Sequence, residues 1–67
     1  MTDMTAAEFA AELKKHGFRV VGAQITSDDC PGIAWKPTMR SGRMDRAHTL
    51  RKVIQKRSEE IARRAAT

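Results

Sequence analysis

The chain has 67 residues, of which 13 are Lys or Arg and 8 are Asp or Glu, giving a formal net charge of +5. This length corresponds to a single domain, residues 1–67, with a marginal hydrophobic core, and the single cysteine excludes an intramolecular disulfide framework and suits a reducing compartment. There is no basic leader and no apolar run near the roughly 20 residues of a membrane span, so we expect a cytoplasmic protein without a membrane partner.

The N-terminal segment predicts a short helix over residues 5–16, with a local signal at each end. Thr5 and Glu8 form the T-x-x-E pattern of a capping box, in which each side chain accepts a hydrogen bond from the other residue's backbone. Apolar residues recur between them and Gly17 at helical spacing. Gly17 then stands where a left-handed residue commonly ends a helix.

The next segment, FRVVGAQIT (residues 18–26), predicts one β-strand because it is rich in β-branched side chains. Within a single strand, Gly22 marks a bulge or a close backbone approach. Alternation along that strand places Phe18 and Val20 on one face and Ile25 on the other.

Residues 33–38, IAWKPT, predict a second short strand after a turn. Proline has no N–H to donate, so this strand should end at Pro37 or lie at a sheet edge. A third short strand is a further option within residues 38–44, and a long helix follows from about Asp45 to Arg64. The order α-β-β-(β)-α predicts a small two-layer α+β domain with a long C-terminal helix.

The predicted last helix is longer than the other elements and must extend beyond the core. About 20 residues span about 30 Å, and the far end carries Ile61 and Ala65. This end either frays over residues 62–67 or forms a contact between two copies. We therefore expect a monomer or a homodimer through the C-terminal helix.

Positive charge is concentrated in the second half of the chain. Residues 1–35 carry three basic and five acidic side chains, whereas residues 36–67 carry ten basic and three acidic ones. Around the start of the last helix these cations oppose the positive end of the helix dipole, and a bound anion would relieve that repulsion. We therefore predict a phosphate-binding surface formed by Trp35, Lys36, Thr38, Arg40, Ser41, Arg43, Arg46, Thr49, Arg51 and Lys52.

These residue types suit a nucleic-acid backbone in different ways. Lysine and arginine neutralise phosphates, and serine and threonine hydroxyls donate to them. The Ser41-Gly42 pair gives the backbone freedom for a close approach to phosphate. Trp35 either stacks on a base or packs into the core.

The charge asymmetry favours a small non-enzymatic nucleic-acid-binding module that contacts phosphates through this basic loop and helix N-terminus. The sequence leaves DNA and RNA open, and we expect such a module to be encoded by a phage or mobile element. One alternative is an interaction module or inhibitor that docks on an acidic protein surface. A cationic surface that serves solubility alone is the simplest reading of the same charges.

The chain offers few groups for catalysis or metal binding. His16 suits the negative end of the first helix, and His48, near the start of the last helix, has no catalytic partner at a recognisable spacing. Asp28-Asp29 is typical of a turn, and Cys30 has no second cysteine for a zinc site. We expect no enzymatic activity, no metal and no cofactor.

Two segments, ELKKHGFRVV and RAHTLRKVIQKR, together resemble the frame of HicA-type toxins, through Gly17-Phe18, the following strand and Thr49-Leu50. That family implies an α-β-β-β-α fold like that of double-stranded-RNA-binding domains, and cleavage of messenger RNA. The family's catalytic histidine lies in a Gly-Ser-His segment at the start of the second strand, where this chain has ITSDDCPGIAW without histidine. The resemblance thus implies a relative that binds RNA without cleaving it, or, as a second alternative, a degenerate ribonuclease.

Overall fold

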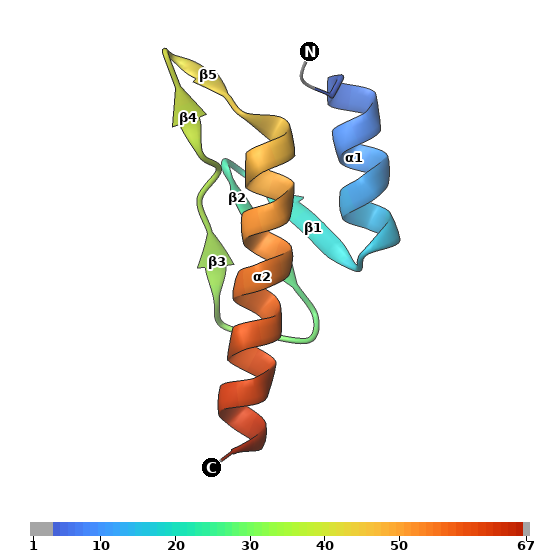
Figure 1. Cartoon of the computed structure of the whole chain (residues 1–67). Coiled ribbons are helices and arrows are strands. Elements are labelled where there is room, and N and C mark those ends of the chain that lie inside the picture. The colour runs from blue at the N-terminus through green and yellow to red at the C-terminus, as the bar shows by residue number, and fades with distance from the viewer. Residues whose placement is uncertain (1–3, 67) are drawn as a thin grey trace.

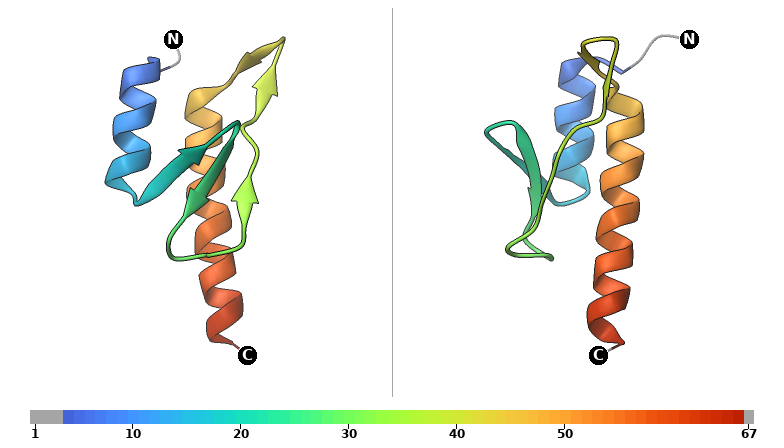
Figure 2. Two further views of the ribbon diagram at one scale, coloured as in Figure 1. Left: turned by 180° about the vertical axis from the view of Figure 1, so that it is seen from behind. Right: turned by 90° about the vertical axis from the view of Figure 1, so that its left-hand side faces the viewer.

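Two helices lie side by side and cover one face of a three-stranded antiparallel sheet (Figures 1 and 2). The structure is a computed structural model that describes residues 4–66. This is the small α+β domain with a long C-terminal helix that the sequence predicts. Its elements in chain order are α1 (Ala6–Lys15), β1 (Phe18–Val21), β2 (Gln24–Ser27), β3 (Ala34–Trp35), β4 (Met39–Arg40), β5 (Arg43–Met44) and α2 (Arg46–Ala65).

Helix α1 begins and ends as its local sequence predicts. The Thr5 N–H donates to Glu8 Oε1 at 2.8 Å, and the Glu8 N–H donates to Thr5 Oγ1 at 3.1 Å, which completes the capping box. The carboxylate accepts the Thr5 backbone N–H, and this bond, with the one to the Thr5 side chain, lowers the pKa of Glu8. At the other end, Gly17 has a φ of +83° and turns the chain into β1.

The predicted strand over residues 18–26 is wrong, because these residues form a hairpin of two strands. The two-residue turn Gly22-Ala23 joins β1 to β2, and Gly22 has a φ of +63°. A positive φ at the first turn residue alone is the φ pattern of a type II′ hairpin turn, where glycine is favoured. The turn places Ile25 directly opposite Val20, so Ile25 shares the face of Phe18 instead of the opposite face.

The predicted second strand is present as β3, which pairs with β2 at the edge of the sheet. Pro37 follows β3 and is not part of a strand. Residues 39–44 form a separate two-stranded hairpin, β4–β5, instead of the single extra strand that the sequence left open. In Figure 1 this hairpin projects from the end of the molecule where α2 begins.

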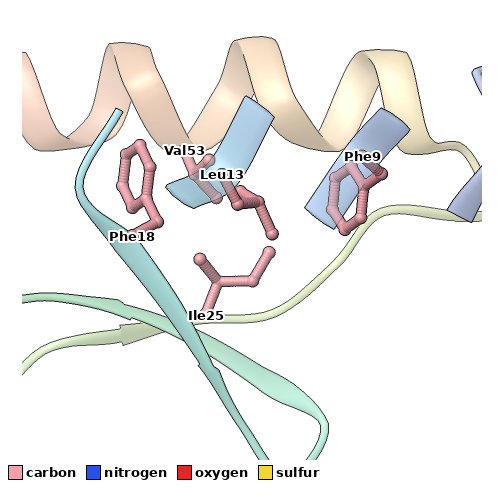
Figure 3. Close-up of a cluster of buried hydrophobic side chains, with 5 residues drawn as sticks. All are labelled: Phe9, Leu13, Phe18, Ile25 and Val53. Carbon is pink, nitrogen blue, oxygen red and sulfur yellow. The ribbon is translucent and has the colours of Figure 1, made fainter. Parts of the chain in front are cut away.

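The core lies between the helices and the sheet. Five buried apolar side chains meet there, each no more than 7% exposed: Phe9, Leu13, Phe18, Ile25 and Val53 (Figure 3). Four come from the first 25 residues and Val53 comes from α2, where Leu50 and Ile54 also pack against the cluster. Met4, which precedes the α1 N-cap, packs against this cluster, as expected of the residue before an N-cap.

Arg57 joins the C-terminal end of α1 to the middle of α2. Its guanidinium carbon lies 4.3 Å from the centre of the Phe18 ring, and its Nη1 donates to the carbonyl oxygen of His16. The side chain is only 16% exposed and also reaches Asp29, with 3.9 Å between Nη1 and Oδ2. Arg57 interrupts the apolar stripe of α2 because it serves as a link to α1.

The end of α2 remains helical to Ala65, so the expected fraying from residue 62 is not present in the described chain. Ile61 is 44% exposed there, outside the core. Glu60 accepts from both Arg63 and Arg64, which lowers the pKa of Glu60 and raises that of Arg63. Glu59, on the same helix, accepts from the Gln55 side chain at 3.1 Å.

Candidate functional site

A groove lies between the edge strand β3 and helix α2. We call it the lysine groove, and its volume is about 310 Å³. Three of its lining side chains are lysines, two of them one helical turn apart on α2 and the third just after β3. Its lining residues are Trp35, Lys36, Thr38, Lys52, Val53 and Lys56.

The groove has an apolar floor and a cationic rim. Val53 is 2% exposed, and the half-buried Trp35 contacts the core through Phe18, with ring centroids 6.0 Å apart at 79°. The sequence left Trp35 either in the core or at a ligand, and the residue in fact contacts both the core and the groove. Lys36, Lys52 and Lys56 are all exposed.

Two backbone hydrogen bonds hold Thr38, which lines the groove, against the start of α2. Its N–H donates to Thr49 Oγ1 at 2.9 Å, and its carbonyl oxygen accepts the Asp45 N–H at 2.9 Å. Thr49 is 1% exposed, so its hydroxyl is an internal acceptor and cannot reach a phosphate. The prediction that Thr49 contacts ligand is therefore wrong, because the residue anchors the chain before β4 to α2.

The β4–β5 hairpin carries two of the predicted arginines at its tip, and we call residues 39–44 the arginine hairpin. Arg40 and Arg43 are paired across the strands and flank the two-residue turn. Ser41 and Gly42 have φ values of 54° and 76°, the pattern of a type I′ turn. The sequence suggested that the freedom of the Ser41-Gly42 backbone serves a close approach to phosphate. The hairpin turn already requires this backbone conformation.

The remaining predicted cations divide between this end of the molecule and other sites. Arg40 Nε lies 3.5 Å from Asp45 Oδ2, and Arg46 donates to the Met4 carbonyl oxygen at 3.3 Å, so both have protein partners. Arg51 is exposed and lies about 160° around the helix from Val53, on the side away from the core and the groove. The structure therefore brings Lys36 and Lys52 together but does not bring Arg51 to them.

No acidic side chain of residues 4–66 forms an ion pair with the lysines of the groove. Asp28 pairs with Arg19, Asp29 lies near Arg57, and Glu60 holds two arginines at the far end of α2. Within residues 4–66, the side chains of seven lysines and arginines form no ion pair. Two of them lie in the last turn of α1, and three line the groove. The seven are Lys14, Lys15, Lys36, Arg43, Arg51, Lys52 and Lys56.

Lys56 is the residue that the sequence prediction missed. A signal for it exists, since Lys52 and Lys56 are four residues apart and must share a helix face. The prediction followed the charge run near the helix N-terminus, where Asp45 in fact caps the helix and accepts the His48 N–H at 3.1 Å. The repulsion expected there is thus partly relieved by Asp45, and the unpaired charge of Lys52 and Lys56 lies about two to three turns further along α2.

A second hollow on the sheet has a different character. Its lining includes Arg19, Asp28 and the turn that follows β2, and Arg19 and Asp28 are paired across it. Cys30 also lines it but is completely buried. The paired charges make this hollow a poor match for a polyanion.

The described residues contain no group of three His, Cys, Asp or Glu side chains placed to hold a metal ion. The two histidines have different surroundings. His16 pairs with Glu12 at 3.6 Å, and within residues 4–66 His48 forms no ion pair. Neither helix is long and apolar enough, over the residues described, to cross a membrane. Comparisons with family models, with curated proteins and with solved structures find no match to this chain.

Proposed function

We propose that this chain is a small non-enzymatic nucleic-acid-binding module. One observation carries the proposal: lysines from segments 16 or more residues apart converge on a single groove without an acidic partner in the described chain. Such a cluster attracts polyanions, and each neutralised phosphate releases counterions. Arg43 at the tip of the arginine hairpin extends the same positive surface.

The proposal also bears on the alternatives drawn from the sequence. An acidic protein would use the same cations, but the tryptophan in the groove adds a flat aromatic surface that suits a base. The order of helices and main-sheet strands is compatible with a relative of HicA-type toxins that lacks their catalytic histidine. A cytoplasmic setting and a source in a phage or mobile element stay predictions from the sequence.

The test is a salt series of binding to labelled DNA and RNA, measured by fluorescence anisotropy. If Lys36, Arg43, Lys52 and Lys56 each neutralise one phosphate, log Kobs falls against log salt with a slope of about −3.6 on duplex DNA or about −2.8 on a single strand. The double variant Lys52→Gln/Lys56→Gln should reduce the steepness by about 1.8 on duplex DNA or about 1.4 on a single strand.

The matched control is Lys14→Gln/Lys15→Gln, which removes the same charge from the exposed last turn of α1. This control should leave the salt slope unchanged. The proposal fails if neither DNA nor RNA binds at low salt, or if the two double variants weaken binding equally.

A further inference from the structure

The lysine groove combines two surfaces that a bare phosphate site does not need. Its rim is cationic, but its floor is formed by Trp35 and by Val53, which is 2% exposed. An inorganic anion gains nothing from an apolar floor. The combination instead suits a ligand with an aromatic ring and an attached phosphate.

The size of the groove limits the ligand further. A volume of about 310 Å³ is at the lower end of the range for small-ligand sites, roughly 300–1,000 Å³. This space admits one nucleotide and not the width of a double helix.

The walls of the groove are held in place before any ligand arrives. Both backbone groups of Thr38 are bonded to residues at the start of α2. Trp35 is fixed against Phe18, and Phe18 in turn lies beneath the Arg57 guanidinium. Because β3 has a sheet neighbour on only one side in the described chain, its other backbone edge is open to hydrogen-bond a ligand.

From these features, and resting on the proposed function, we propose that the lysine groove holds one unpaired nucleotide of a single strand. The base lies against Trp35, and its phosphates lie among Lys36, Lys52 and Lys56. A base inside a duplex is stacked on its neighbours and cannot reach this floor. The protein therefore binds single strands in preference to duplexes of the same sequence.

The test uses the intrinsic fluorescence of the unmodified protein. Trp35 is the only tryptophan and the chain has no tyrosine, so the emission reports on the surroundings of this one groove residue. The probes are a short oligothymidylate, an oligouridylate, a strand of equal length with abasic sites at every position, and a mixed-sequence strand alone and as a duplex. The abasic strand keeps the phosphates but has no bases.

We expect both base-containing homopolymers to change the Trp35 emission and to bind about tenfold more tightly than the abasic strand at equal salt. The mixed-sequence strand should bind more tightly than its duplex. Equal affinity for abasic and normal strands, or binding without a change in emission, overturns the single-nucleotide proposal while leaving nucleic-acid binding intact. Failure of all probes to bind overturns the proposed function as well.

Variants sharpen the assignment, and all of them keep an aromatic ring at position 35. Binding of Trp35→Phe is followed by the anisotropy of labelled strands, because this variant has no tryptophan emission. Lys56→Glu changes an exposed helix residue and should weaken single-strand binding and reduce the emission change more than Lys15→Glu does. Trp35→Phe keeps an aromatic ring against Phe18 but reduces the stacking surface, so it should lower the preference for normal over abasic strands. If both Lys56→Glu and Lys15→Glu have the same effect, the nucleotide does not occupy this groove.

Discussion

Arg57 illustrates how one side chain can have a role opposite to its appearance in the sequence. It stands in the basic run of residues 36–57, yet its guanidinium covers the Phe18 ring and donates to the His16 carbonyl oxygen. Gly17 lies beside it, and a Cβ there would be in ordinary contact at 3.6 Å from Arg57 Nη1, so it is the φ of +83° that favours glycine at this position. The charge pattern alone would assign Arg57 to the surface, because the local sequence does not reveal that Arg57 packs on the Phe18 ring.

The first prediction at this scale concerns stability. Arg57→Ala should lower the free energy of unfolding by about 2 kcal/mol, because it removes a cation–π contact and a charged hydrogen bond to a helix end. Arg51→Ala, an exposed arginine of the same helix, should change it by less than about 0.5 kcal/mol. Urea unfolding followed by circular dichroism measures both, and equal losses would contradict the role of Arg57.

The second prediction concerns the charge of Glu8. The hydrogen bonds from Thr5 hold the pKa of Glu8 below its ordinary value of 4.5 in the folded chain. Its contribution is therefore fully present above about pH 4.5 and is lost as the pH falls through the folded pKa.

Glu8→Gln keeps a side-chain acceptor for the capping box but removes the charge. Its melting temperature should be below that of the wild type at about pH 7, and the gap should close at about pH 3. Glu12→Gln is the control on the same helix. A gap for Glu8→Gln that persists unchanged at low pH would show that the carboxylate charge is not responsible.

At the scale of elements, local signals predicted the helices better than the strands. The ends of α1 depend on Thr5, Glu8 and Gly17, which act within one turn, so the sequence alone determines them. The β1–β2 hairpin escaped prediction because Gly22-Ala23 is a two-residue turn without a polar residue. The arginine hairpin escaped because its strands have only two residues each, too few for a visible alternation.

The candidate site was predicted in part, and the physical reason differs between residues. Lys36 and Lys52 follow from charge alone, and both line the groove. Thr49 has a hydroxyl that could bind phosphate, but it is buried where the chain after β3 crosses α2. This crossing is a tertiary contact that the local sequence does not reveal. Helix periodicity could place Lys56 with Lys52, but no local pattern predicts that Lys36 joins them.

A third prediction concerns the anchor between the chain before β4 and α2. Thr49→Val keeps the shape of the side chain but leaves the Thr38 N–H without its acceptor, at a cost of about 1–3 kcal/mol. Hydrogen exchange of the Thr38 amide, followed by NMR, should accelerate in this variant. Thr49→Ser retains the hydroxyl and should protect the amide, and similar exchange in both variants would contradict the anchor.

At the scale of the whole molecule, the charge is divided between two ends. The helix end around Glu60 is internally paired, whereas the three lysines of the groove and Arg43 of the arginine hairpin form no ion pair in the described residues. Like charges gathered on a small core repel one another and destabilise the folded state. The same arrangement that attracts an anion therefore has a cost in its absence.

This cost leads to the fourth prediction. Raising sodium chloride from about 10 mM to about 200 mM should raise the melting temperature of the free protein, because salt screens the repulsion among Lys36, Lys52 and Lys56. A screening gain of about 0.5 kcal/mol corresponds to about 2–4 °C for a domain of this size. Lys52→Gln/Lys56→Gln should show a smaller rise, and a melting temperature that falls with salt in the wild type would contradict the argument.

The reactivity of the Cys30 thiol can report how often the turn around it opens. Its side chain is completely buried, and the turn around it is closed by the Cys30 N–H bond to Ser27 O at 3.2 Å and the Ile33 N–H bond to Cys30 O at 3.3 Å. A thiol reagent can react with Cys30 only while this turn is open. If the turn closes faster than the reagent reacts, the observed reaction rate measures the equilibrium constant for local opening. Since the chain has one cysteine, a single reaction trace shows whether a ligand bound in the lysine groove makes this turn open less often.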